Sequence, residues 1–596
     1  MTLALLLLAA APLAAPADTA PAPPRIEYAI EASLDEGTDV LTGRARLTYV
    51  NRSGGALDTL WFHQHLNAFR PNSDWARREL EYREDRFQRL GPDEHAFERL
   101  TAVRVDGSEV TPVHPGAPDS TVVAVPLPSL LRSGDSVVVT LDWQARLSTL
   151  PRRQGRSGRH YDFAQWYPRI AVHKEGEWFT QPLMPQGAFY GEFGSYDVTI
   201  ELPADHVIGA TGVPVDGDPG WAQAAAPGTG EVLYQRDLYT ASQAPRLGLL
   251  EGEPAGGRKR VRWRAEDVHH FAWSANPRFI YEQGTTARAG EAGEPIVLRV
   301  LYLPADSDWA DGVALERTET ALVWLQELFG PYLWPQLTNL HRIEPGGTEF
   351  PMMMMNGSPS MGLILHEAGH QYLHGLLANN EWAEGWLDEG FQSFVDDWYA
   401  EEQGQADVWQ PSLDRIRQVY QAGMAQPIGL PGAEYASPAV YSMMTYVKPA
   451  LVLRMLREMV GEETMRDILR EYFARHAPGH VTESDLRAVV RDVTGRDHDW
   501  FFDQWIHSDA TVDYSVAEAS TERLADGRWR TRVVVHRDGE AWMPVVVEVA
   551  GERRELSGPG REQVVEFVTR ERPDEVVVDP DAVLIDLRPQ NNRRPL

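Results

Sequence analysis

The chain of 596 residues contains no cysteine, which excludes disulfides, cysteine nucleophiles and thiolate metal sites. Lysine is almost absent as well, because every basic residue except Lys174, Lys259 and Lys448 is an arginine. The formal net charge of −31 argues against nucleic acid as a partner, since binding a polyanion needs a concentrated basic face. Where arginines do cluster, as in RKRVRWR (258–264), they alternate with apolar residues and predict the solvated face of a strand.

The sequence also lacks any stretch long and apolar enough to predict a membrane-spanning helix. Its most apolar run opens the chain, is interrupted by proline and ends in a small-x-small triplet: MTLALLLLAAAPLAAPA (1–17). This pattern predicts a cleaved export signal followed by a linker at 18–24. We therefore expect a periplasmic or secreted protein.

A chain of this length exceeds what one hydrophobic core usually holds, so several domains are expected. Short alternating and β-branched runs bounded by turn residues predict an N-terminal β domain over 25–270, with a charged helix inserted at 75–90. Apolar residues at three- and four-residue steps then predict a mainly α domain over 271–512. The period returns to two over 513–596, which predicts a small C-terminal β-sandwich.

The stretch with the clearest chemistry begins at HEAGH (366–370), in a predicted helix that starts near Ser358-Pro359-Ser360 with the proline in its first turn. His366 and His370 are four residues apart, so both imidazoles project from one helix face and can converge on one ion. Glu367 lies beside that face, where it can hold a water molecule next to the metal without ligating it.

Two histidines leave a tetrahedral ion short of ligands, and a catalytic zinc takes a third protein ligand while keeping its fourth position open. Glu389 is the candidate, because a second amphipathic helix is predicted around it in EGWLDEGFQSFVDDWY (384–399). The turn residues of NNEWAEG (379–385) let the chain reverse between the two helices. The alternative is a packed helix whose histidines have ordinary partners.

His374 continues the histidine row at the next helical turn. The metzincin pattern, however, requires a glycine three residues and a histidine six residues after the second histidine. Leu373 and Leu376 occupy those places. We therefore interpret His374 as a packing residue or as a support for a ligand.

The combination of HEAGH, eighteen further residues and Glu389 within WLDEGF resembles the zinc signature of the gluzincin aminopeptidases, the family of aminopeptidase N and leukotriene hydrolase. The resemblance implies an N-terminal saddle-like β domain and a thermolysin-like, mainly α catalytic domain, and the C-terminal β-sandwich is compatible with it. It also implies one Zn²⁺ per chain, held by His366, His370 and Glu389, with Glu367 as the general base.

Three further segments carry the resemblance. GGTEF (346–350) is similar to the family's Gly-x-Met-Glu-Asn motif, which implies that Glu349 binds the free α-amine of the substrate. YSMMTYVKPALVLRML (441–456) resembles the family's tyrosine segment and implies that Tyr446 stabilises the transition state. FAQWYPRIAVH (163–173) resembles the segment that places a glutamine near the amine, which makes Gln165 a candidate.

The resemblance departs from the family at several positions. Thr348 and Phe350 replace the methionine and asparagine of the amine-binding motif, while Val447 and Pro449 interrupt the family's Glu-Lys-Gly triplet beside the tyrosine. Between these segments, PMMMMN (351–356) predicts a strand along the cleft with two methionines turned inward.

Together these motifs predict a zinc metalloaminopeptidase that removes single residues from peptides with a free N-terminus. A thermolysin-type endopeptidase shares the ligand set but has no use for Glu349. A hydrolase of a non-peptide ligand, and a non-catalytic peptide-binding protein on a peptidase fold, are further alternatives.

Overall fold

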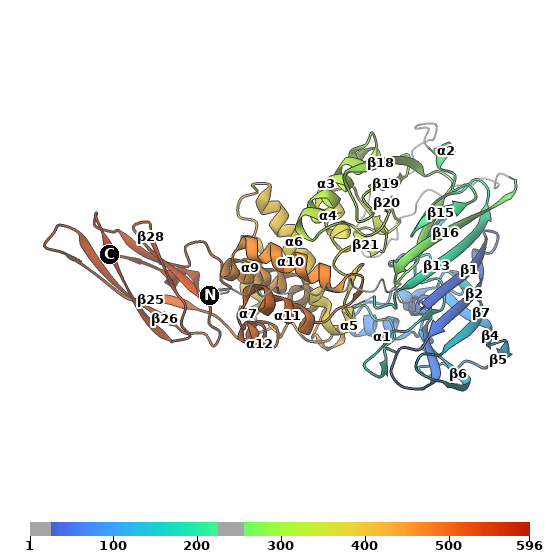
Figure 1. Ribbon diagram of the computed structural model, residues 1–596, viewed down its shortest axis with the longest axis horizontal. Helices are drawn as coiled ribbons and strands as arrows, with labels where there is room; N and C mark the ends of the chain where they lie inside the picture. The colour runs from blue at the N-terminus through green and yellow to red at the C-terminus, as the bar shows by residue number, and fades with distance from the viewer. Residues whose placement is uncertain (1–25, 188, 225–255) are drawn as a thin grey trace, which may run out of the picture.

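The structure is a computed structural model that describes residues 26–187, 189–224 and 256–596. In Figure 1 an N-terminal β region, a central region of sheet and helices, and a C-terminal β-sandwich follow one another along the long axis. This arrangement confirms the predicted multidomain fold class. The predicted export signal (1–17) and linker (18–24) lie outside the described residues. No helix within the described ranges is long and apolar enough to cross a membrane.

An eight-stranded sheet dominates the N-terminal region, and parallel pairing of its strands β1 and β13 joins segments that are far apart in the sequence. Buried and exposed side chains alternate along the long strands, so one face packs on the core. On β16 the arginines are on the exposed side, as the pattern of RKRVRWR predicted. In sheet order the strands are β15 (Val213–Asp216), β16 (Arg258–Val268), β13 (Gly194–Pro203), β1 (Ile26–Asp35), β2 (Val40–Val50), β7 (Ser136–Arg146), β4 (Phe97–Val105) and β5 (Ser108–Glu109).

Smaller sheets connect this region to the rest of the chain. The inserted helix is shorter than predicted: α1 spans Asp74–Glu81, because Ser73 caps its start and Arg83 takes a left-handed φ of 65° just after its end. The strands are β10 (Arg169–Ile170), β3 (Leu57–His63), β6 (Val122–Leu131), β11 (His173–Lys174), β12 (Glu177–Trp178), β14 (Val207–Ala210), β17 (Trp273–Asn276), β9 (His160–Phe163) and β8 (Gly155–Ser157), with the short helix α2 (Trp221–Ala224).

A five-stranded sheet forms one side of the central region, and helices α3 (Val313–Leu328) and α4 (Met361–Gly369) lie against each other beside it (Figure 1). Its strands, in order, are β18 (Ile280–Ala289), β19 (Pro295–Tyr302), β20 (Gln336–His341), β22 (Met353–Asn356) and β21 (Gly347–Phe350). All four residues of β22 are buried, so its methionines pack on both faces of the strand instead of lining an open cleft.

Helix α4 begins and ends differently from the prediction. Ser360 is its N-cap and accepts a hydrogen bond from the backbone N–H of Leu363, so Pro359 precedes the helix and does not lie in its first turn. The helix ends at Gly369. A short strand pair, β23 (Leu377–Ala378) with β24 (Gly479–His480), and helix α5 (Glu381–Glu384) then reverse the chain, with Asn380 capping α5.

The remaining helices form the other side of the central region and carry the chain to the sandwich (Figure 1). They are α6 (Glu389–Glu402), α7 (Gln410–Gln421), α8 (Pro438–Ser442), α9 (Lys448–Val460), α10 (Glu462–His476), α11 (Glu483–Thr494) and α12 (Asp499–Trp505). A π-helical turn, Met443–Val447, separates α8 from α9. Such turns are rare and frequently lie at functional sites.

The C-terminal region is a β-sandwich of two antiparallel sheets. It is joined to the helices by arginines: Arg417 donates to the carbonyl of Asp586 at 2.8 Å, and Arg454 donates to that of Ala582 at 2.9 Å. The strands are β25 (Tyr514–Arg523), β26 (Trp529–Arg537) and β29 (Glu562–Thr569) in one sheet, and β28 (Glu552–Leu556), β27 (Val545–Val549), β30 (Glu575–Val578) and β31 (Arg593–Pro595) in the other.

Candidate metal centre and active site

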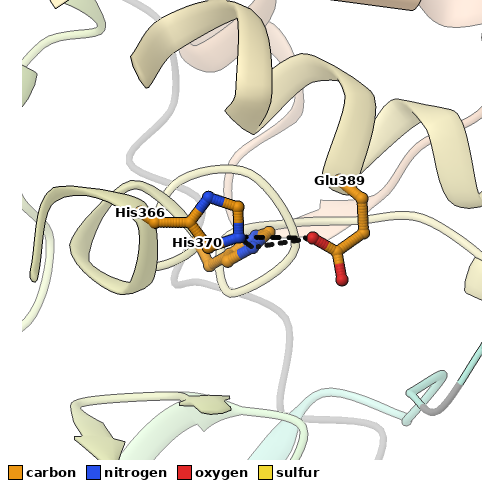
Figure 2. A group of neighbouring side chains, drawn as sticks. All are labelled: His366, His370 and Glu389. Carbon is orange, nitrogen blue, oxygen red and sulfur yellow. Dashed lines mark hydrogen bonds and ion pairs between the residues drawn. The ribbon is translucent and has the colours of Figure 1, made fainter. Parts of the chain in front are cut away.

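Helices α4 and α6 bring the three predicted metal ligands together (Figure 2). His366 lies in the last turn of α4, and His370 is its C-cap with helical backbone angles, so the four-residue spacing holds both imidazoles on one face. Glu389 is the first residue of α6, which packs against α4. In Figure 2 the carboxylate of Glu389 points at both imidazole rings.

The three ligand atoms form a nearly equilateral triangle. Nε2 of His366 is 3.2 Å from Nε2 of His370, and each of these nitrogens is 3.4 Å from Oε2 of Glu389. Tetrahedral bonds of about 2.05 Å separate any two ligand atoms by about 3.3 Å. The triangle therefore fits a zinc ion without rearrangement. Oε2 of Glu389 is also buried with no hydrogen-bond donor among the described residues, which suits a metal ligand.

The other nitrogen of each imidazole is held by a carboxylate. Nδ1 of His366 is 2.7 Å from Oδ2 of Asp396, and Nδ1 of His370 is 2.7 Å from Oδ1 of Asp388. An Nδ1–H that donates to a carboxylate leaves the lone pair of Nε2 free for a metal and fixes the orientation of the ring. Neither aspartate was predicted from the sequence. Their positions in the sequence could have indicated this role, because Asp388 immediately precedes the ligand Glu389 and Asp396 lies two helical turns after it.

Glu367 points into the same space from α4 without joining the triangle. Only 4% of the residue is exposed, and its Oε2 has no hydrogen-bond partner within the described ranges. Burial and the nearby negative charge of Glu349 raise the pKa of Glu367 to about 7, although His366 and His370 oppose this increase. A carboxylate whose pKa is close to neutrality is suited to both accepting and returning a proton.

Because Gly347 has no side chain, the carboxylate of Glu367 can lie against the backbone at this position. A Cβ on this glycine would overlap the Oε1, Cδ and Cγ atoms of Glu367, so any side chain at position 347 would displace the carboxylate. Gly347 opens β21, the strand that also carries Glu349. In the motif GGTEF, the glycine at 347 therefore lets the backbone approach the side chain of Glu367 closely. This contact was not predicted from the sequence.

Glu349 and Tyr446 border the triangle from two other elements. Glu349 is 6% exposed on β21, next to the helix that carries Glu367. Tyr446 lies in the π-helical turn before α9, and its hydroxyl donates to Oε1 of Glu389 at 2.5 Å. Burial raises the pKa of Tyr446 well above its usual value, and the charge of Glu389 adds to this, so the phenol keeps its proton. It can donate a hydrogen bond beside the metal ligands.

The contacts of Gln165 in the structure are with histidines. Its side chain accepts or donates hydrogen bonds in a buried group of histidines, at 3.1 Å from Nδ1 of His65 and 3.4 Å from Nε2 of His270. No contact described for Gln165 reaches Glu349 or the metal ligands. The proposed role of Gln165 at the substrate amine stays a prediction.

His374 does not join the ligand triangle. It is buried with a left-handed φ of 98°, and its ring packs against His269 and Phe189. Its Nδ1 is 3.4 Å from Glu381, and burial lowers the pKa of His374 to about 3. It is therefore a neutral side chain that packs behind the site.

The fold and the geometry define a class of site, that of the gluzincin metallopeptidases: two histidines on one helix, a glutamate on the next and a second glutamate beside the first histidine. Comparison with known proteins finds a family model that matches this part of the chain. The Peptidase family M1 domain matches residues 354–505, the segment that holds α4, α6 and Tyr446. This segment of the chain thus matches an M1 peptidase domain, which confirms the resemblance to the aminopeptidase N-like gluzincins that the motifs indicated.

Two curated relatives show how far the sequence similarity extends. Aminopeptidase N from Streptomyces lividans is 28% identical over 177 residues, covering 28% of this chain and 20% of that protein. The mitochondrial aminopeptidase 2 of Saccharomyces cerevisiae is 28% identical over 148 residues, covering 23% of this chain and 15% of that protein. The matched part of the chain thus spans a fifth or less of the length of these two relatives.

Solved structures extend the likeness of fold to most of the chain. The M1 zinc metallopeptidase from Deinococcus radiodurans has a TM-score of 0.54 at 18% identity, covering 80% of this chain and 93% of that one. Aminopeptidase A from Legionella pneumophila has a TM-score of 0.63 at 13% identity, covering 94% of this chain and 59% of that one.

Proposed function

We propose that the chain is a zinc-dependent aminopeptidase that removes single residues from the N-terminus of peptides and binds one Zn²⁺ per chain. The observation that carries this proposal is the ligand triangle, whose sides of 3.2, 3.4 and 3.4 Å suit a tetrahedral zinc ion. When bound, zinc supplies a Lewis acid that polarises a carbonyl and increases the acidity of water.

The side chains around the triangle provide the remaining steps of peptide hydrolysis. Glu367 takes the proton from the attacking water and passes it to the amine that leaves. The hydroxyl of Tyr446 turns from Oε1 of Glu389 and donates its hydrogen bond to the carbonyl oxygen as negative charge develops there. The ligands themselves are oriented by Asp396 and Asp388, so the reacting groups are arranged before the substrate arrives.

Glu349 gives the proposed exopeptidase character. Its carboxylate lies close enough to raise the pKa of Glu367, and it forms a charge-assisted bond with a terminal ammonium that an internal peptide bond cannot form. This favours an aminopeptidase over a thermolysin-type endopeptidase. The presence of all three ligands and of Glu367 favours an enzyme over a non-catalytic peptide-binding protein.

A panel of aminoacyl p-nitroanilides, each free and N-acetylated, tests the proposed function. We expect hydrolysis of the free compounds only, loss of activity with a chelator, and recovery when zinc is added back. Glu349→Gln should lower kcat/KM for free substrates by at least about 100-fold, because a charge-assisted bond to the ammonium is lost. Equal cleavage of free and acetylated substrates by the intact protein would reject the aminopeptidase assignment.

We also propose that the protein is exported, which the apolar segment at 1–17 supports. N-terminal sequencing of the protein secreted from an expression host should find a mature chain that begins close to residue 18. A chain that stays in the cytoplasm with its first residues intact would contradict this proposal.

A further inference from the structure

Arg153 reaches the candidate active site from the N-terminal β region. It lies in the loop between β7 and β8, and its backbone has a left-handed φ of 57°, which a residue with a side chain adopts only when its surroundings hold it there. Its backbone N–H donates to Oε2 of Glu344 at 2.6 Å, which fixes the loop against the central sheet. The guanidinium then lies over the ring of Phe189, 4.9 Å from its centroid.

The guanidinium of Arg153 is next to the proposed amine anchor but is not hydrogen-bonded to it. Nη1 is 3.8 Å from Oε1 of Glu349, which is beyond hydrogen-bond distance. Nε is buried and has no hydrogen-bond partner in the part of the chain that the structure describes. Although burial lowers the pKa of Arg153, the charges of Glu349 and Glu381 more than reverse this, so the group is a permanent cation. A cation with a free Nε–H donor therefore lies beside Glu349.

The charges around Arg153 indicate which substrate group it can bind. Before a peptide binds, Glu349 is the carboxylate whose charge acts most strongly on Arg153, followed by Glu381. A peptide with a free N-terminus adds an ammonium beside Glu349, so this carboxylate is then shared by two cations. A carboxylate close to the substrate amine would restore the balance. The side chain of the first residue begins at the carbon that carries the amine, so a carboxylate on it is within reach of a cation beside Glu349.

We propose that Arg153 binds the side-chain carboxylate of the first residue, so that the enzyme prefers peptides that begin with glutamate or aspartate. This proposal rests on the proposed aminopeptidase function and names the substrate class of the same site. The planar fork of N–H donors in a guanidinium matches the two oxygens of a carboxylate. The ring of Phe189 packs against the guanidinium and restricts its rotation.

Glutamyl and glutaminyl p-nitroanilides test the proposal, because the two side chains have nearly the same shape and differ in charge. We expect the zinc-loaded wild-type protein to hydrolyse the glutamyl compound with a kcat/KM at least tenfold higher. Arg153→Met should bring this ratio to one or below. Arg152→Gln is the matched control and should leave the ratio unchanged, because Arg152 pairs with Glu344 and lies over Trp75.

The wild-type protein also gives a test that needs no variant. Free L-glutamate should inhibit hydrolysis of alanyl p-nitroanilide at a concentration at least tenfold lower than free L-glutamine does. Equal inhibition by the two amino acids, or a glutamyl-to-glutaminyl ratio of one in the wild type, would overturn the assignment of Arg153 while the aminopeptidase function stands. Failure to hydrolyse any free aminoacyl anilide would instead overturn the proposed function itself.

Discussion

Gly347→Ala tests whether the position of Glu367 controls activity. The added methyl group would overlap the carboxylate of Glu367, which must then move by on the order of 1 Å or more. A misplacement of about 1 Å costs about 100-fold in rate, or about 2.7 kcal/mol, and complete loss of a general base costs up to about 10,000-fold. We expect the loss in kcat/KM for alanyl p-nitroanilide to fall within this range while the zinc content stays unchanged, since the three atoms nearest to the added methyl group all belong to Glu367 and not to a metal ligand.

Gly362→Ala provides the matched control. Gly362 lies on the same helix as Glu367 but is exposed, and a Cβ there has nothing within 4 Å. Its activity should stay within about twofold of wild type, because exposed helix positions tolerate alanine well. A Glu367→Ala background sharpens the test, since it removes every atom that the methyl group would overlap, so Gly347→Ala should not lower its residual activity further. Near wild-type activity of Gly347→Ala, with zinc bound, would refute this reasoning.

Three further predictions concern single side chains. Glu367→Gln should reduce turnover by about 100- to 10,000-fold and leave one zinc per chain in metal analysis; a variant that keeps its activity would exclude Glu367 as the base. Tyr446→Phe should lower kcat by about 100-fold or more with little change in zinc content, as kinetics and metal analysis would show, whereas an unchanged kcat would remove Tyr446 from the mechanism. Lys448 is fully buried, and burial lowers its pKa from 10.5 to about 8, so Lys448→Met should increase stability at pH 7 by at most about 3 kcal/mol. This gain in stability should disappear as the pH rises from about 8 to 10.5, because in this range Lys448 of the folded chain has released a proton that the unfolded chain still holds. Calorimetry at both ends of the range measures the gain. An equal gain at pH 8 and pH 10.5 would contradict the prediction.

The sequence was sufficient to predict those parts of the site that depend on short-range periodicity. The spacing of His366 and His370 places both on one helix face whatever the rest of the chain does, and Glu389 follows after a length that allows one reversal. The alternation in RKRVRWR likewise predicted which face of β16 is solvated. These predictions needed only the geometry of a single helix or strand.

Contacts between segments that are distant in the sequence could not be predicted from periodicity. Gly347 and Glu367 are twenty residues apart and meet only because β21 packs against α4. Arg153 approaches Glu349 from a loop of a different region, and nothing in the residue pattern of that loop, RRQGRSGRH (152–160), indicates this contact. The end of helix α4 at Gly369 was also not predicted, because it depends on the turn and the strand pair that follow.

The central claim is that His366, His370 and Glu389 hold one metal ion, and metal analysis of purified protein tests it most directly. We expect one zinc per wild-type chain after removal of loosely bound metal, and less than a tenth of that in Glu389→Ala under the same conditions. Asp414→Ala, which removes an exposed carboxylate on α7, should retain the full zinc content. A wild-type protein that takes up no stoichiometric zinc, or a Glu389→Ala variant that keeps it all, would contradict the account.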